Sequence, residues 1–270
     1  MRHPFFDLPT PIVIGHRGSS GEAPENTLPA FARALEQRAE ILETDVHATR
    51  DGVVVVYHDD GVDRTTDGCG AIAELDFAAL RRLDAGFAFS LDEGRSFPWR
   101  SRGLRVATLA EAFAACPEAR FNIEIKCDSA ALVDGTLDAV RAAGRASRTL
   151  LTAGDDAAMA RLRRRLAETG LATAVGASSG DVVRFVRAAA AGEAPPSEPM
   201  ALQIPTEFAG RPLVTRALVE FAHAHDVQVH VWTVNDPAEM HALLDLGVDG
   251  LVSDFPARVH AVLRERGVRR

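Results

Sequence analysis

Short runs of apolar and β-branched residues alternate along this chain with longer stretches rich in alanine, leucine and arginine. This alternation is typical of a parallel sheet covered by crossover helices, because parallel strands cannot be joined by a tight turn. Eight runs are candidate strands: residues 12–16, 41–47, 121–126, 148–152, 172–176, 200–204, 227–232 and 249–252. Eight parallel strands with helices outside describe a (β/α)8 TIM barrel, and a doubly wound open sheet is the structural alternative.

The windows between these strands have helical patterns, and several carry helix start signals. Asn26 suits an N-cap, and Pro237 and Pro256 suit first-turn positions. The predicted helices span residues 27–38, 130–143, 157–168, 181–190, 214–224, 237–246 and 256–265. A chain of 270 residues fits one such barrel, so we expect a single domain over residues 1–270.

One extended run, residues 53–58, is surplus to the eight strands. It follows the second strand after only five residues, whereas neighbouring parallel strands need a crossover of about a dozen residues or more. We therefore predict an antiparallel hairpin arm that turns at Asp51-Gly52 and brings His58 level with Asp45.

Residues 59–106 form a long segment rich in glycine, aspartate and arginine, with one predicted helix at 74–83. Long excursions between barrel strands are usually functional, so we interpret this segment as an inserted cap between the hairpin and the third strand.

The balance of charge and the cysteines limit the partners and the compartment. Thirty basic and 38 acidic residues give a net charge of −8, which disfavours nucleic-acid partners and requires a local cationic site for any bound anion. Cys69, Cys116 and Cys127 fit neither a disulfide framework nor a zinc motif, so we expect free thiols in the cytoplasm. With no signal peptide and no apolar run of about 18 residues, we expect no stable membrane insertion.

Acidic side chains occupy inward positions of two neighbouring strands. Side chains alternate along a strand, so Glu43 and Asp45 share the interior face of the second strand, as Glu124 and Lys126 do on the third. Three clustered carboxylates are stable mainly when a cation lies among them, and oxygen ligands favour Mg²⁺, Ca²⁺ or Mn²⁺. The alternative is a salt-bridge network in which Lys126 is the counter-ion.

Two histidines are expected at the same rim. His16 ends the first strand, where barrel active sites form, and the hairpin carries His58 to that rim. Two imidazoles suit proton transfer near neutral pH, while Arg17 and Lys126 could bind an anionic group. Together with a metal ion these groups indicate phosphoryl transfer. Trp232, inward on the seventh strand, either lines the pocket or fills the core.

Short motifs occur in a fixed order along nearly the whole chain. They are His16-Arg17-Gly18, Pro24-Glu25-Asn26-Thr27, Glu43-Thr44-Asp45-Val46, Thr49-x-Asp51-Gly52, His58-Asp59, Arg64-Thr65-Thr66, Glu124-Ile125-Lys126, Val231-Trp232-Thr233-Val234-Asn235, Gly247-Val248-Asp249-Gly250 and Ser253-Asp254-x-Pro256. The ordered set closely resembles the glycerophosphodiester phosphodiesterases. The chain departs from that pattern at Ser253, at Arg38-Ala39-Glu40, and at Thr152-Ala153-Gly154-Asp155, where the family commonly has Ser-Phe.

The resemblance implies a TIM barrel that hydrolyses glycerophosphodiesters, which are small-molecule substrates, to glycerol 3-phosphate and an alcohol. It implies one divalent ion, Mg²⁺ or Ca²⁺ with Mn²⁺ possible, and a small cap matching residues 59–106. The site residues carried over by motif are Glu43, Asp45 and Glu124 for the metal, His16 and His58 for acid/base catalysis, and Arg17 and Lys126 for the phosphate.

The reaction we expect is attack of the glycerol 2-hydroxyl on phosphorus, followed by opening of a cyclic phosphate by water as the histidines exchange roles. Two other functions are compatible with the same barrel. One is lysophospholipase D or phospholipase C-like activity on a longer lipid, and the other is a non-catalytic protein that binds glycerol phosphates. The presence of both histidines and all three acids favours catalysis.

Overall fold

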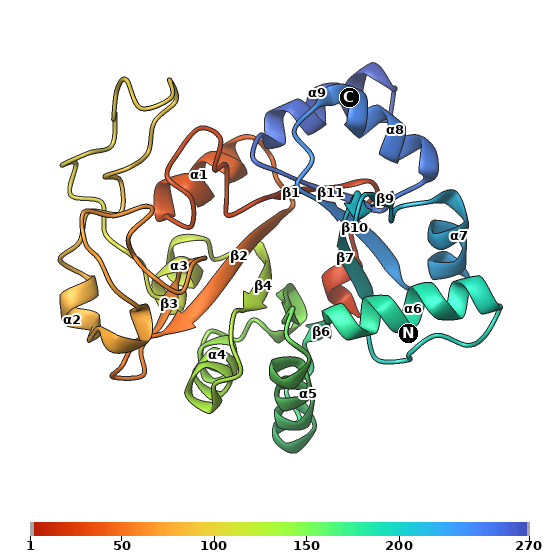
Figure 1. The fold of residues 1–270 in the computed structure, drawn as a ribbon, viewed down its shortest axis with the longest axis horizontal. Helices are drawn as coiled ribbons and strands as arrows, with labels where there is room; N and C mark the ends of the chain where they lie inside the picture. The colour runs from red at the N-terminus through yellow and green to blue at the C-terminus, as the bar shows by residue number, and fades with distance from the viewer. Residues whose placement is uncertain (1–2, 269–270) are drawn as a thin grey trace.

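Eight parallel strands run side by side in the computed structural model, which describes residues 3–268 (Figure 1). In spatial order they are β6 (Ala174–Val175), β5 (Thr149–Thr152), β4 (Arg120–Ile125), β2 (Ile41–Ala48), β1 (Ile12–Gly15), β11 (Gly250–Ser253), β10 (Gln228–Trp232) and β7 (Ala201–Pro205). The outer strands β6 and β7 meet through a parallel bridge between Gly176 and Ala201. The sheet therefore closes on itself, which confirms the TIM barrel and excludes the open-sheet alternative.

The seven predicted helices all form, with ends within two residues of the predicted ones, and they lie outside the strands (Figure 1). They are α1 (Leu28–Glu36), α4 (Ala130–Ala142), α5 (Asp156–Thr169), α6 (Ser179–Ala191), α7 (Arg216–Ala224), α8 (Pro237–Leu246) and α9 (Pro256–Glu265). Pro237 and Pro256 occupy first-turn positions as predicted.

The predicted N-cap of the first helix is wrong by one residue. Thr27 caps α1, because its hydroxyl accepts a hydrogen bond from the Ala30 amide. Asn26 has a φ of 56°, which is incompatible with the extended backbone of an N-cap. Its side-chain amide instead contacts Asp45 and Thr44 of β2, so Asn26 organises the site.

A further helix, α3 (Leu109–Ala115), was not predicted and completes the outer ring between residues 59–106 and β4. It begins with a capping box in which Thr108 and Glu111 satisfy each other's backbone amides. This Thr-x-x-Glu spacing was the sequence signal for the helix. A two-residue hairpin, β8 (Glu207–Phe208) with β9 (Arg211–Pro212), was also missed.

The hairpin arm forms as predicted. Strand β3 (Val54–Val56) pairs antiparallel with the end of β2, with Val46 opposite Val56 and Ala48 opposite Val54. Since His58 follows β3 by two residues, the arm returns this histidine to the rim of the barrel.

Residues 59–106 lie beside the barrel next to β3 (Figure 1). The predicted helix at 74–83 is replaced by a 3-10 turn, Ile72–Glu74, and a short helix α2 (Phe77–Leu80), because Leu75 and Asp76 are extended between them. The segment has an apolar cluster of its own that includes Val62, Ile72 and Leu80 and packs against Val55 of the arm.

Apolar side chains form clusters outside the barrel and near the end at which its strands begin. Polar residues occupy the end at which the strands finish. Leu42 and Val46 of β2 pack outward against the helices, as their parity predicted. Phe5 and Phe6 pack with Ile12 and Ile14 of β1 in a separate buried cluster. Cys69, Cys116 and Cys127 are unpaired. No helix within residues 3–268 is both long and apolar enough to cross a bilayer.

Candidate active site

One cavity of about 300 Å³ is lined by every side chain that the sequence singled out for function. These are His16, Arg17, Glu43, Asp45, His58, Glu124, Lys126 and Trp232. They come from the carboxyl ends of β1, β2, β4 and β10 and from the arm, so they gather at one end of the barrel. The cavity is also lined by residues that were not predicted: Asn122, Thr152, Gly154, Ser179, Gln203 and Val252.

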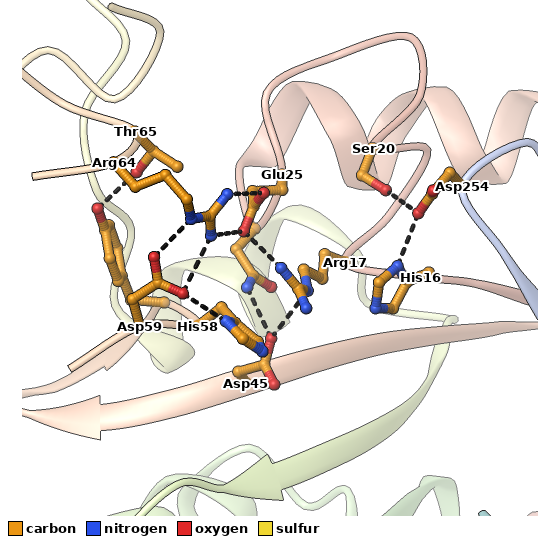
Figure 2. Close-up of polar contacts among 12 residues, drawn as sticks. His16, Arg17, Ser20, Glu25, Asp45, His58, Asp59, Arg64, Thr65 and Asp254 are labelled. Atoms are coloured by element: carbon orange, nitrogen blue, oxygen red, sulfur yellow. Dashed lines mark hydrogen bonds and ion pairs between the residues drawn. The ribbon is translucent and has the colours of Figure 1, made fainter. Parts of the chain in front are cut away.

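His16 is held by a carboxylate from the other end of the chain. Its Nδ1 lies 2.6 Å from Oδ1 of Asp254, which also accepts a hydrogen bond from Ser20 (Figure 2). Burial alone would raise the pKa of Asp254, but these bonds, with one from Asn235, lower it to about 2. Because the ionised Asp254 only accepts, Nδ1 of His16 donates and Nε2 is left for proton transfer.

The hydrogen bond that His16 donates to Asp254 also shifts the pKa of His16 itself. Burial lowers the pKa of His16, and the hydrogen bond to Asp254 with the negative charge of Glu43 outweighs burial, so that the net pKa is raised. Asp254 belongs to the Ser253-Asp254-x-Pro256 motif, which was the only sequence signal for this partner.

His58 has an equivalent partner in its neighbour along the chain. Its Nδ1 lies 2.6 Å from Oδ1 of Asp59. Arg64 binds the same carboxylate through Nε, at 2.5 Å from Oδ2, and through Nη2, at 3.2 Å from Oδ1 (Figure 2). These bonds from Arg64 are the main reason that the pKa of Asp59 falls to about 2. Each of the two histidines therefore has an ionised aspartate at Nδ1.

The three acids lie at different depths in the cavity. Glu43 and Asp45 are 9% and 1% exposed, and the Glu124 side chain is 33% exposed. Oε2 of Glu43 accepts a hydrogen bond from the Arg17 amide at 2.8 Å. Burial and the adjacent charge of Asp45 raise the pKa of Glu43 to about 8.

Lys126 lies between two of the acids. Its Nζ is 3.5 Å from Oδ1 of Asp45 and 3.3 Å from Oε2 of Glu124. As the side chains stand, no three His, Cys, Asp or Glu residues within residues 3–268 converge tightly enough to hold a metal ion. The lysine contacts thus match the alternative reading of Lys126 as a counter-ion.

The chemistry of the donors nevertheless fits a divalent cation. Three carboxylates face two basic groups, Arg17 and Lys126, and burial together with the adjacent charge of Asp45 raises the pKa of Glu43 in spite of them. The donors are all oxygens, which is the set that Mg²⁺ and Ca²⁺ prefer. Gly154 keeps space beside this set, since a Cβ there would lie 3.3 Å from Oε1 of Glu124.

The raised pKa of Glu43 predicts how the stability of the metal-free protein changes with pH. A folded-state pKa above the ordinary 4.5 means that the proton favours folding below pH 4.5, and this contribution is lost as the pH rises to about 8. Against Glu43→Gln, which cannot ionise, the wild type should lose stability steadily between these values. Urea unfolding in EDTA measures it, and a difference between the two proteins that stays constant with pH would contradict the charge argument.

Comparisons with known proteins agree on one family. The model of the glycerophosphoryl diester phosphodiesterase family matches residues 16–258. A Mycobacterium tuberculosis protein named probable glycerophosphodiester phosphodiesterase 2 is 32% identical over 95% of this chain and 92% of its own length. A glycerophosphodiester phosphodiesterase of Caldanaerobacter subterraneus is 30% identical, over 95% of this chain and 99% of its own.

A solved structure extends the agreement to three dimensions. The Oleispira antarctica phosphodiesterase, in complex with the product sn-glycerol-3-phosphate, superposes with a TM-score of 0.74. It is 26% identical, and the match covers 94% of this chain and 97% of the other.

Proposed function

This chain belongs to the glycerophosphoryl diester phosphodiesterase family and is an enzyme of that class, and we propose that it cleaves its diesters with two histidines, one divalent metal ion and a cyclic phosphate intermediate. The observation that carries the proposal is one cavity lined by two histidines, three carboxylates and two cationic groups, in which each histidine is held by an aspartate from outside the lining. Acid, base and anion-binding groups within one enclosed site are what phosphodiester cleavage needs.

The substrate we propose is a short, polar glycerophosphodiester. The product bound in the Oleispira relative, sn-glycerol-3-phosphate, supports this class. A cavity of about 300 Å³ in which most lining residues are polar or charged suits a glyceryl phosphate better than the acyl chain of a lysophospholipid. Trp232 lines the cavity and is 43% exposed, so it is not core filling, and it would cover the glyceryl group.

Positively charged side chains of the cavity would bind the phosphate of the substrate. The guanidinium of Arg17 and the ammonium of Lys126 can bind its oxygens, and Glu43, Asp45 and Glu124 would hold the metal ion. Lys126 would then exchange its contacts with Asp45 and Glu124 for a contact with the phosphate. When bound, the ion supplies Lewis-acid stabilisation of charge and a lowered pKa for a hydroxyl at the site.

The histidines would move the protons in both steps. One imidazole takes the proton of the glycerol 2-hydroxyl as that oxygen bonds to phosphorus, and the other protonates the alcohol as its bond to phosphorus breaks. Water then opens the cyclic phosphate, and the two imidazoles act in reverse. Because Asp254 and Asp59 hold Nδ1 of His16 and His58, each ring would exchange its proton through Nε2.

We also propose that residues 59–106 act as a cap within a single domain that spans residues 1–270. The segment contributes Arg64 to the surroundings of His58, and its apolar cluster packs against the hairpin arm.

Removing divalent ions is expected to abolish activity. Purified protein is incubated with glycerophosphocholine, glycerophosphoethanolamine or lysophosphatidylcholine, with and without EDTA. Glycerol 3-phosphate is measured for the first two substrates, and released choline is measured for lysophosphatidylcholine. Activity on the first two substrates should vanish after chelation and return with Mg²⁺ or Ca²⁺. Undiminished activity in protein that elemental analysis shows to be metal-free would end the metal proposal, and a preference for lysophosphatidylcholine would favour the lipid alternative.

A further inference from the structure

Two motifs without an assigned role meet beside the cavity. Glu25 lies in the loop that follows β1, and Arg64 lies in the cap. Nη1 of Arg64 donates to Oε2 of Glu25 and Nη2 donates to Oε1, each at 2.7 Å (Figure 2). This paired geometry is the strong form of an arginine–carboxylate contact, and it joins the cap to the rim of the barrel.

The same guanidinium also binds the partner of His58. Nε and Nη2 of Arg64 donate to the two oxygens of Asp59, which in turn holds Nδ1 of His58. Arg64 thus spans two carboxylates with a single planar group (Figure 2). A lysine could not do so, because its ammonium group is a compact charge and lacks the planar fork of donors that a guanidinium presents.

Glu25 continues the chain of contacts toward the phosphate-binding group. Its Oε1 accepts a hydrogen bond from Nη1 of Arg17 at 2.8 Å. Burial would raise the pKa of Glu25, but the bonds from Arg64 and Arg17 lower it, so the carboxylate stays charged between the two guanidiniums. Nε of Arg17 lies 3.5 Å from Oδ2 of Asp45.

We propose that Arg64 is a positioning residue that orients His58 through Asp59, and that Glu25 ties this orientation to the guanidinium of Arg17. Neither Arg64 nor Glu25 lines the catalytic cavity, so each acts through its neighbour. The inference rests on the proposed function, because it assumes proton transfer by His58 and phosphate binding by Arg17. Under it, the cap supplies part of the catalytic geometry.

A purely structural role for Arg64 would be to fasten the cap to the barrel. The chain offers a matched control for that role, since Arg50 binds Asp76 of the cap through Nε and Nη2, at 2.9 and 2.5 Å. This pair has the same chemistry and also anchors the cap, but neither residue contacts His58 or lines the cavity. Loss of anchoring alone should therefore affect Arg50→Gln and Arg64→Gln alike.

The test is a double-mutant cycle on kcat and KM for the release of glycerol 3-phosphate from glycerophosphocholine. Arg64→Gln should lower kcat by about 10- to 100-fold with little change in KM, because a misdirected base or acid impairs the reaction more than binding. In the Asp59→Asn background it should cause no further loss, because its route to His58 is already broken. Arg50→Gln should stay within about twofold of the wild type, since surface ion pairs contribute little.

Three results would overturn the positioning role. They are losses that multiply in the double variant, an effect confined to KM, and an equal effect of Arg50→Gln. If Arg64→Gln melts below the assay temperature, Arg64→Lys keeps the charge without the fork and should still lower kcat; wild-type kcat in that variant also overturns the proposal. An inactive wild type would instead refute the proposed function, so the two failures are distinguishable.

Discussion

We expect His16→Ala or His58→Ala to lower kcat by roughly 10²- to 10⁴-fold, which is the usual contribution of a general acid or base. Each substitution removes one imidazole of the proposed pair and leaves Arg17 and Lys126 to bind the phosphate. KM should therefore change much less than kcat. The measurement is steady-state release of glycerol 3-phosphate by the holoenzyme, with the metal content of each variant determined beforehand.

The double variant and a control make this result specific. Because the two histidines act in the same steps, His16→Ala combined with His58→Ala should cost far less than the product of the single losses. His223→Ala is the matched control, since His223 also pairs with an aspartate, Asp249 at 2.8 Å, but does not line the cavity. Near wild-type turnover in either single variant would refute the proposed pairing.

A methyl ether at the 2-hydroxyl of the substrate should abolish turnover by the wild-type enzyme. The proposed route uses this oxygen as the nucleophile, so capping it removes the attacking group while the phosphate and the leaving alcohol stay unchanged. The capped diester should still bind and should inhibit cleavage of the ordinary substrate in competition. Product is followed by mass spectrometry, which also detects the cyclic phosphate formed from the uncapped diester.

Continued cleavage of the capped substrate would show that water attacks phosphorus directly. That outcome would remove the cyclic intermediate but leave both histidines with roles as acid and base. The histidine variants and the capped substrate therefore examine separate parts of the mechanism.

Much of the barrel and of the cavity lining could be predicted because the signals are local. Alternation along a strand is a property of the extended backbone, so it was sufficient to place Glu43 and Asp45 on one face and Leu42 and Val46 on the other. The short Asp51-Gly52 connection required an antiparallel return, and that return brought His58 to the rim.

Other features of the site depend on segments that meet only after the barrel closes. Asp254 lies 238 residues from His16 in the sequence, and no periodicity could have joined them. Asn26 satisfied the composition rule for an N-cap, yet its left-handed backbone turned its amide toward Asp45 and left the capping role to Thr27.

The sequence by itself determined the eight strands and the eight candidate site residues that line the cavity, because strand parity and connection length are set by the backbone over a few residues. Only the tertiary structure decided which group binds which: Lys126 between Asp45 and Glu124, Asp254 on His16, and Arg64 between Asp59 and Glu25. These pairings depend on side-chain directions and on loops brought together by barrel closure and cap packing, and neither is encoded in local spacing.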